Sequence, residues 1–156
     1  MVPVYLLILA IAIGIFQKVY RGKCFVTAFL LSLIVLTVGF TGIWAFMGHY
    51  FKADMVAQGI GWPAGNPFQK EVAFTNLGIG VLGILCIWFR GNFWLATIIM
   101  NSVFLLGAAS IHIKDIIEKG NMNIYNAGPV LYADILGPLI LIGLFIAKQY
   151  TDPEPK

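Results

Sequence analysis

The sequence predicts an all-α integral membrane protein, a helical bundle with about five transmembrane helices. Of its 156 residues, 60% are hydrophobic and only 11% are charged, a composition that excludes a soluble domain of this size. A helix needs about 20 apolar residues to cross a hydrocarbon core of about 30 Å. Five apolar stretches meet or approach that length: Val2–Phe16, Cys24–Met47, Glu71–Phe89, Phe93–Ile113 and Pro129–Ala147.

The first stretch, Val2–Phe16, is the shortest of the five. It reaches span length if Gln17–Tyr20 continue the helix and the Lys18 side chain extends to the membrane surface. No positive charge precedes the apolar run, which favours a retained membrane helix over a signal peptide. We expect this helix to lie at the periphery of a core made by the other four.

The sequence predicts one membrane domain, residues 1–150, because no connection is long or polar enough to form a separate soluble domain. The polar, proline-containing tail, residues 151–156, is expected to be disordered on the cytoplasmic side. Cys24 and Cys86 have no CxxC partner, so we interpret both as small apolar residues rather than metal ligands or disulfides.

Basic residues in the connections predict the orientation of the chain. One side carries six of them: Lys18, Arg21, Lys23, Arg90, Lys148 and Lys156. The other side carries four: Lys52, Lys70, Lys114 and Lys119. The positive-inside rule places the larger group in the cytoplasm of a plasma-membrane protein, with the N-terminus outside and the C-terminus cytoplasmic. The net charge of +3 therefore reflects topology, and no nucleic-acid partner is expected.

The connection between the second and third stretches carries clear local signals. Residues Phe51–Ile60 predict a short interfacial helix. The turn-rich segment GWPAGNPFQ follows, with Asn66 placed to cap the third helix and Pro67 at its start. In the later connection, Gly120 suits the end of the fourth helix.

Small residues at helical spacing predict where helices touch. Gly42 and Ala45 share a face of the second stretch, and Gly80 and Gly83 share a face of the third. In lipid, small residues let two helix backbones approach closely. We interpret these positions as helix–helix contacts.

Polar residues also follow helical spacing in the last two stretches. The fourth stretch aligns Asn101, Leu105, Ala108, His112 and Asp115 on one face. In the fifth, Asp134 lies four residues before Pro138, which cannot donate to the carbonyl of residue 134. A kink there is expected to open a small polar pocket. The alternative is a structural kink in which Asp134 hydrogen-bonds a neighbouring helix.

The predicted topology brings ionisable residues from four helices to a similar depth near the outer leaflet. These are His49, Glu71, His112 and Asp134, with Asn76 just over one turn deeper than Glu71. Ionisable groups within membrane spans are costly and often mark function. The candidate ligand-binding or proton-relay residues are His49, Glu71, Asn76, Asn101, His112 and Asp134.

Three chemistries fit two histidines and two carboxylates: a zinc or iron site, a proton relay, and recognition of a polar head group such as a quinone ring or a lipid. In the alternative interpretation, the histidines only bond water and loops at the interface. The chain has no GxSxG, Walker A, HExxH or dinucleotide-binding motif. We therefore assign no catalytic residue and leave the metal and the cofactor open.

The leading functional hypothesis is a binding or accessory membrane subunit with an outer-leaflet polar site. It would work within the lipid bilayer as a homo-oligomer or with a partner membrane subunit. One alternative is a metal- or quinone-linked redox subunit that uses His49, Glu71, His112 and Asp134. The other is a small proton-coupled transporter or channel.

Three stretches carry a resemblance to a known family: MGHYFKADMVAQGIGWPAGNPFQKEVAFTNLGIGVLGIL, GNFWLATIIMNSVFLLGAASIHIKDI and NAGPVLYADILGPLIL. Together they resemble a family of small bacterial and archaeal multi-pass membrane proteins classed as a domain of unknown function. The layout is more distantly similar to that of DoxX-like four-helix membrane proteins. The resemblance covers roughly residues 40–146. The DoxX comparison implies a redox or quinone-linked setting.

Overall fold

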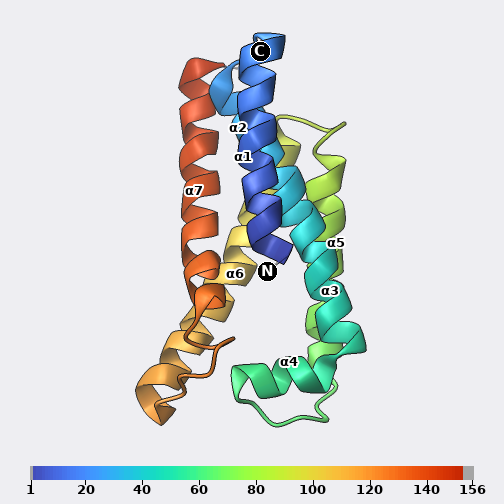
Figure 1. Ribbon diagram of the computed structural model, residues 1–156, viewed down its shortest axis with the longest axis vertical. Coiled ribbons are helices and arrows are strands. Elements are labelled where there is room, and N and C mark those ends of the chain that lie inside the picture. The colour runs from blue at the N-terminus through green and yellow to red at the C-terminus, as the bar shows by residue number, and fades with distance from the viewer. Residues whose placement is uncertain (1, 153–156) are drawn as a thin grey trace.

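All regular elements in the described part of the chain, residues 2–152 of the computed structural model, are helical, which confirms the all-α class. In chain order they are α1 (Val2–Arg21), α2 (Phe25–Leu33), the π-helical segment η1 (Ile34–Phe40), α3 (Thr41–Phe51), α4 (Ala53–Ile60), α5 (Phe68–Leu85), α6 (Asn92–Lys119) and α7 (Pro129–Thr151). Figure 1 shows the long helices side by side as a bundle, with the short α4 lying across one end.

Within residues 2–152, four helices are long and apolar enough to cross a membrane: α1, the continuous helix from α2 to α3, α6 and α7. The fifth predicted crossing, α5, is an 18-residue helix that does not meet the same combination of length and apolarity. It begins with the polar residues Gln69–Glu71, and it ends at Leu85 rather than Phe89 because the chain turns there. A fifth span therefore stays a prediction.

Several predicted helix ends are confirmed. The first helix does continue past Phe16, to Arg21. The Oδ1 atom of Asn66 accepts a hydrogen bond from the backbone N–H of Phe68, at 2.8 Å, where α5 begins. Gly120 ends α6 in the left-handed conformation, with φ of 64°, which favours glycine.

The connections gather at two ends of the bundle (Figure 1), and α4 lies at one of them. At the other, the end of α7 meets the start of α2: Thr27 Oγ1 donates to the Asp152 carboxylate at 2.6 Å, and Thr151 is the last residue of α7. Residues 151 and 152 of the predicted tail thus lie beside the start of α2, and residues 153–156 lie outside the described part, so a disordered tail stays a prediction. Which end faces the cytoplasm stays a prediction.

Helix α1 is peripheral, as expected. Only Ala10 and Gly14 among its described residues are buried. Gly14 lies directly against Phe29 of α2, and a methyl group at this position would come within 2.9 Å of the Phe29 ring. Most of its other side chains up to Phe16 are apolar and exposed, as suits contact with lipid.

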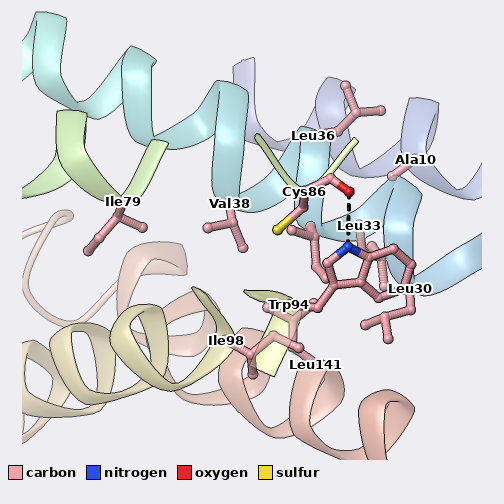
Figure 2. Packing of buried hydrophobic residues seen from close by; sticks show 11 residues of the cluster. Ala10, Leu30, Leu33, Leu36, Val38, Ile79, Cys86, Trp94, Ile98 and Leu141 are labelled. Atoms are coloured by element: carbon pink, nitrogen blue, oxygen red, sulfur yellow. Dashed lines mark hydrogen bonds between the residues drawn. The ribbon is translucent and has the colours of Figure 1, made fainter. Parts of the chain in front are cut away.

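The core is one cluster of buried apolar side chains from α1, α2, η1, α5, α6 and α7, and Trp94 of α6 is fully buried within it (Figure 2). Its indole Nε1 donates to the backbone oxygen of Cys86 at 2.9 Å, so its polar atom is satisfied inside the core. The cationic groups of Arg90 and Lys148 lie 5.5 and 5.8 Å from the ring centroid. Cys86 is a buried free cysteine, as its sequence context predicted.

The predicted small-residue contact joins η1 and α3 to α5. A methyl group on Gly42 would lie 2.8 Å from the backbone oxygen of Asn76, and one on Gly80 would lie 2.9 Å from the backbone oxygen of Gly39. A methyl group on Gly83 would lie still closer, 2.5 Å from the backbone nitrogen of Gly39. These two helices therefore pack backbone to backbone, which no larger residue permits.

Candidate functional site

The predicted polar residues belong to separate hydrogen-bond networks. Within residues 2–152, no hydrogen bond or ion pair joins His49, Glu71, His112 or Asp134 to another of the four. Both histidines instead bond to amide side chains that the sequence did not single out. Whether the four groups share one site stays a prediction.

His49, at the end of α3, is held by α5. Its Nδ1 lies 2.7 Å from Oε1 of Gln69, a residue that is only 5% exposed. An amide oxygen can only accept, so Nδ1 of His49 carries the proton. The Gln69 Nε2 group is left without a partner among the described residues, although its side chain is almost fully buried.

His112, on α6, is held in the same way by the connection between α6 and α7. Its Nδ1 lies 2.7 Å from Oδ1 of Asn126, and both residues are buried. The Asn126 amide nitrogen donates in turn to the backbone oxygen of Asn121 at 2.7 Å. The indole ring of Trp62 stacks on the imidazole, with 5.7 Å between ring centroids. The Nε2 atom of His112 has no partner in the described part of the chain.

Asp115, one turn beyond His112, joins three segments. Its carboxylate accepts from Trp62 Nε1 at 3.1 Å and from Asn121 Nδ2 at 2.6 Å, and it pairs with Lys119 Nζ at 2.6 Å. The amide nitrogen of Asn121 also donates to the backbone oxygen of Ile60, at 2.8 Å. We call the two connections joined in this way, residues 53–67 and 120–128, the cap.

Glycine makes the close fit of the cap possible. Any side chain on Gly59 would overlap the Tyr125 ring, and one on Gly61 would overlap the Asn121 and Asn123 side chains. The backbone N–H of Tyr125 also donates to the oxygen of Gly59, at 3.1 Å. The cap is therefore a packed unit whose two connections touch through backbone and side chains alike.

Two of the predicted residues on α5 lie apart from the histidine networks. Glu71 is exposed, and its side chain has no partner in the described residues. Asn76 is 9% exposed and donates its amide to the backbone oxygen of Val72 at 2.9 Å, within its own helix. Its backbone lies in the glycine contact with α3.

The remaining two predicted residues lie deeper, on α6 and α7. Asn101 is 5% exposed and Asp134 is 8% exposed. Neither side chain has a hydrogen bond or ion pair with any described residue. Pro138 lies inside α7 and is also buried.

A surface pocket of about 290 Å³ lies between the two histidine networks. Its lining residues are Trp62, Pro63, Asn66, Phe68, Gln69 and Lys119. Gln69 is the partner of His49, Trp62 stacks on His112, and Lys119 pairs with Asp115. Each network therefore reaches this space, which we call the cap pocket, through a bonded or stacked neighbour.

A second pocket, of about 490 Å³, lies between the end of α3, α4 and the start of α5, around Lys52, Asp54 and Lys70. No predicted site residue lines it, so it is the weaker candidate. Within residues 2–152, no three His, Cys, Asp or Glu side chains are grouped to hold a metal ion. The metal hypothesis therefore has no ligand set in this part of the chain.

Sequence reasoning missed the residues that connect the networks. Gln69 and Trp62 belong to the segment GWPAGNPFQ, which was interpreted as a turn and a helix start. Asn121 and Asn126 lie in the other connection. One signal could have found them. The polar stripe of α6 ends at His112 and Asp115, and two such side chains, if buried, need polar partners, which the nearby connections can supply.

Comparison with known proteins identifies the family of the chain. The model of a family described as a family of unknown function (DUF6790) matches residues 1–154. No curated protein and no solved structure matches the chain. The match confirms the expected family of unknown function, while the resemblance to DoxX-like proteins stays a prediction.

Proposed function

We propose that this chain, which belongs to the family of unknown function DUF6790, is a binding or accessory membrane protein that holds the polar head group of a membrane amphiphile in its cap pocket. The observation that supports this most is the lining of the pocket, which contains one neighbour from each histidine network. The pocket lies where the long apolar helices end. A ligand with its tail in the bilayer can reach it.

The chemistry of the lining favours an acceptor-rich head group. Gln69 Nε2 is unpartnered and Lys119 is a cation, so both can donate to carbonyl, carboxylate or phosphate oxygens. The faces of Trp62 and Phe68 and the ring of Pro63 supply apolar walls. A volume of about 290 Å³ lies at the small end of ligand sites, which fits a head group rather than a whole lipid.

The membrane arrangement is part of the same proposal. We place the cap at the outer leaflet, because five of the six basic residues assigned to the cytoplasm lie in the described chain at the opposite end. We take α5 as the fifth crossing, since it packs along α3 between the same two ends. The exposed apolar face of α1 is the surface on which a second copy or a partner membrane subunit would pack.

Replacing Gln69 with leucine is expected to weaken head-group binding about tenfold, because it removes the unpaired amide donor and the tether of His49. Native mass spectrometry of the detergent-solubilised chain measures binding of two probes, a short-tailed benzoquinone and phosphatidylglycerol. Preference for one of them identifies the class of head group.

Glu71→Gln is the matched control, since Glu71 lies two residues away on the same helix, is exposed and does not line the pocket. It should bind both probes as the unmodified chain does. The proposal fails if neither probe binds, or if Gln69→Leu and Glu71→Gln bind both probes equally well.

A further inference from the structure

Three buried polar side chains on α6 and α7 lack partners. Asn101, Ser102 and Asp134 are 5%, 5% and 8% exposed. The Ser102 hydroxyl oxygen is fully buried without a hydrogen bond, and neither Asn101 nor Asp134 has a side-chain partner among the described residues. Buried polar groups in proteins are nearly always satisfied, by protein, by water or by an ion. The Ser102 hydroxyl therefore calls for a partner that is not part of the chain. The polar atoms of Asn101 and Asp134 keep a little accessible surface, so they can reach the same partner.

The register of α6 against α7 places the three residues close together. At one end of the helix pair, His112 of α6 bonds Asn126, just before α7 begins. At the other end, Lys148 of α7 lies over the ring of Trp94 of α6. Interpolation between these two contacts puts Pro138 level with Ser102. Asp134 then lies about one helical turn nearer the cap. All of these residues belong to the buried stripes of the two helices.

Pro138 adds a further oxygen to this region. It has no N–H, so the backbone carbonyl of Asp134, four residues earlier, loses its usual helical donor. The region thus offers a carboxylate, this backbone carbonyl, an amide oxygen and a hydroxyl. Hard oxygen donors of this kind bind protons and hard metal cations.

The charge of the region selects the ligand. Asp134 is the only acidic residue among these donors, and an ionised carboxylate buried without a partner is strongly unfavourable. One positive charge neutralises it, whereas a divalent ion would leave an excess charge in the apolar interior. We propose that the α6–α7 interface binds one monovalent cation, a proton or a sodium ion, at Asp134.

The neighbouring charges do not supply this cation. On α6, the nearest titratable residue is His112, which lies about one and a half turns nearer the cap than Asp134, with Asp115 beyond it. The packed part of α2, Phe25–Leu33, contains no titratable residue. On α7 itself, Lys148 lies at the far end, over Trp94. The site is also separate from the cap pocket, whose lining contains none of its residues.

Thermal unfolding of the purified full chain in detergent tests the site. Sodium is titrated against choline at constant ionic strength, and pH is varied separately from 5 to 8. If sodium binds, the Tm rises by at least about 3 °C with added sodium. If a proton binds, the Tm is independent of sodium and falls as the pH rises, because the emptied carboxylate stays buried. Asp134→Asn, which is neutral and of the same shape, should remove either response.

Two further variants make the result decisive. Ser102→Ala keeps the carboxylate but loses one ligating oxygen. The sodium or proton concentration that gives half of the full rise in Tm should therefore increase about three- to tenfold. Glu118→Gln, an exposed carboxylate on the same helix as Ser102, should respond as the unmodified chain does. The proposal is overturned if the unmodified chain and Asp134→Asn respond identically to sodium and to pH. If Asp134→Asn does not fold, an unshifted midpoint in Ser102→Ala overturns it.

Discussion

Replacing Gly80 with alanine is expected to destabilise the protein by about 1–3 kcal/mol, because the added methyl group has no space between α3 and α5. It would lie 2.9 Å from the backbone oxygen of Gly39 and from the backbone nitrogen of Ile43. Both contacts are to backbone atoms, so no side-chain rotation relieves them. The two helices must separate, which also weakens the neighbouring contacts at Gly42 and Gly83.

The same substitution two residues earlier supplies the control. A methyl group on Gly78 of α5 meets nothing within 4 Å. Gly78→Ala should therefore stabilise the helix, by up to about 1 kcal/mol, because alanine loses less backbone entropy than glycine. Unfolding in mixed micelles, followed by circular dichroism, measures both variants. Effects of the same sign would contradict the close approach of the two helices at Gly80.

Replacing Asp115 with alanine is expected to release the cap from α6. The carboxylate accepts from Trp62 and Asn121, on the two different connections of the cap, and pairs with Lys119. Without it, the indole N–H of Trp62 has no acceptor and its stacking on His112 is weakened. Amide hydrogen exchange in residues 53–66 and 121–128 should accelerate on the order of tenfold or more, as expected when a hydrogen bond to an ionised group is lost.

Glu118→Ala is the control for the cap. Glu118 lies on the same end of α6, but it is exposed, and its one ion pair among residues 2–152 is with Lys114, at 3.8 Å, on the helix surface. Exposed pairs of this kind contribute little to stability. Exchange in the cap should be unchanged in this variant. Equal protection of the cap in Asp115→Ala and in the unmodified chain would show that Asp115 does not hold it.

Features with a local cause could be predicted from the sequence. The short helix α4, the capping hydrogen bond of Asn66 at the start of α5 and the end of α6 at Gly120 each follow from a few adjacent residues. The close contact at Gly42 and Gly80 was visible because helical spacing alone brings small residues to one face. Helix α6 continues past the apolar stretch that ends at Ile113 and stops at Lys119, as the expected end at Gly120 implies, since an apolar stretch marks the membrane and not the end of a helix.

The partners of the histidines could not be predicted, because they depend on how two irregular connections fold against each other. Gln69 faces His49 across 20 residues of sequence, and Trp62 reaches Asp115 across 53. No spacing rule relates such residues. The π-helical segment was missed for a different reason: the run Ile34–Phe40 is as apolar as its flanks and carries no composition signal.

This π-helical segment gives one long helix two different faces. Helix α2 packs on α1 and α7, whereas α3, its direct continuation, packs on α5. A wider turn takes in an additional residue, and each residue corresponds to about 100° of rotation around an α-helix. The hydroxyl of Thr41 bonds the carbonyl of Leu36, five residues earlier, within the widened stretch. The segment thus rotates the glycine face of α3 toward α5 without interrupting the helix. The two halves of this helix can therefore be matched to their different neighbours independently.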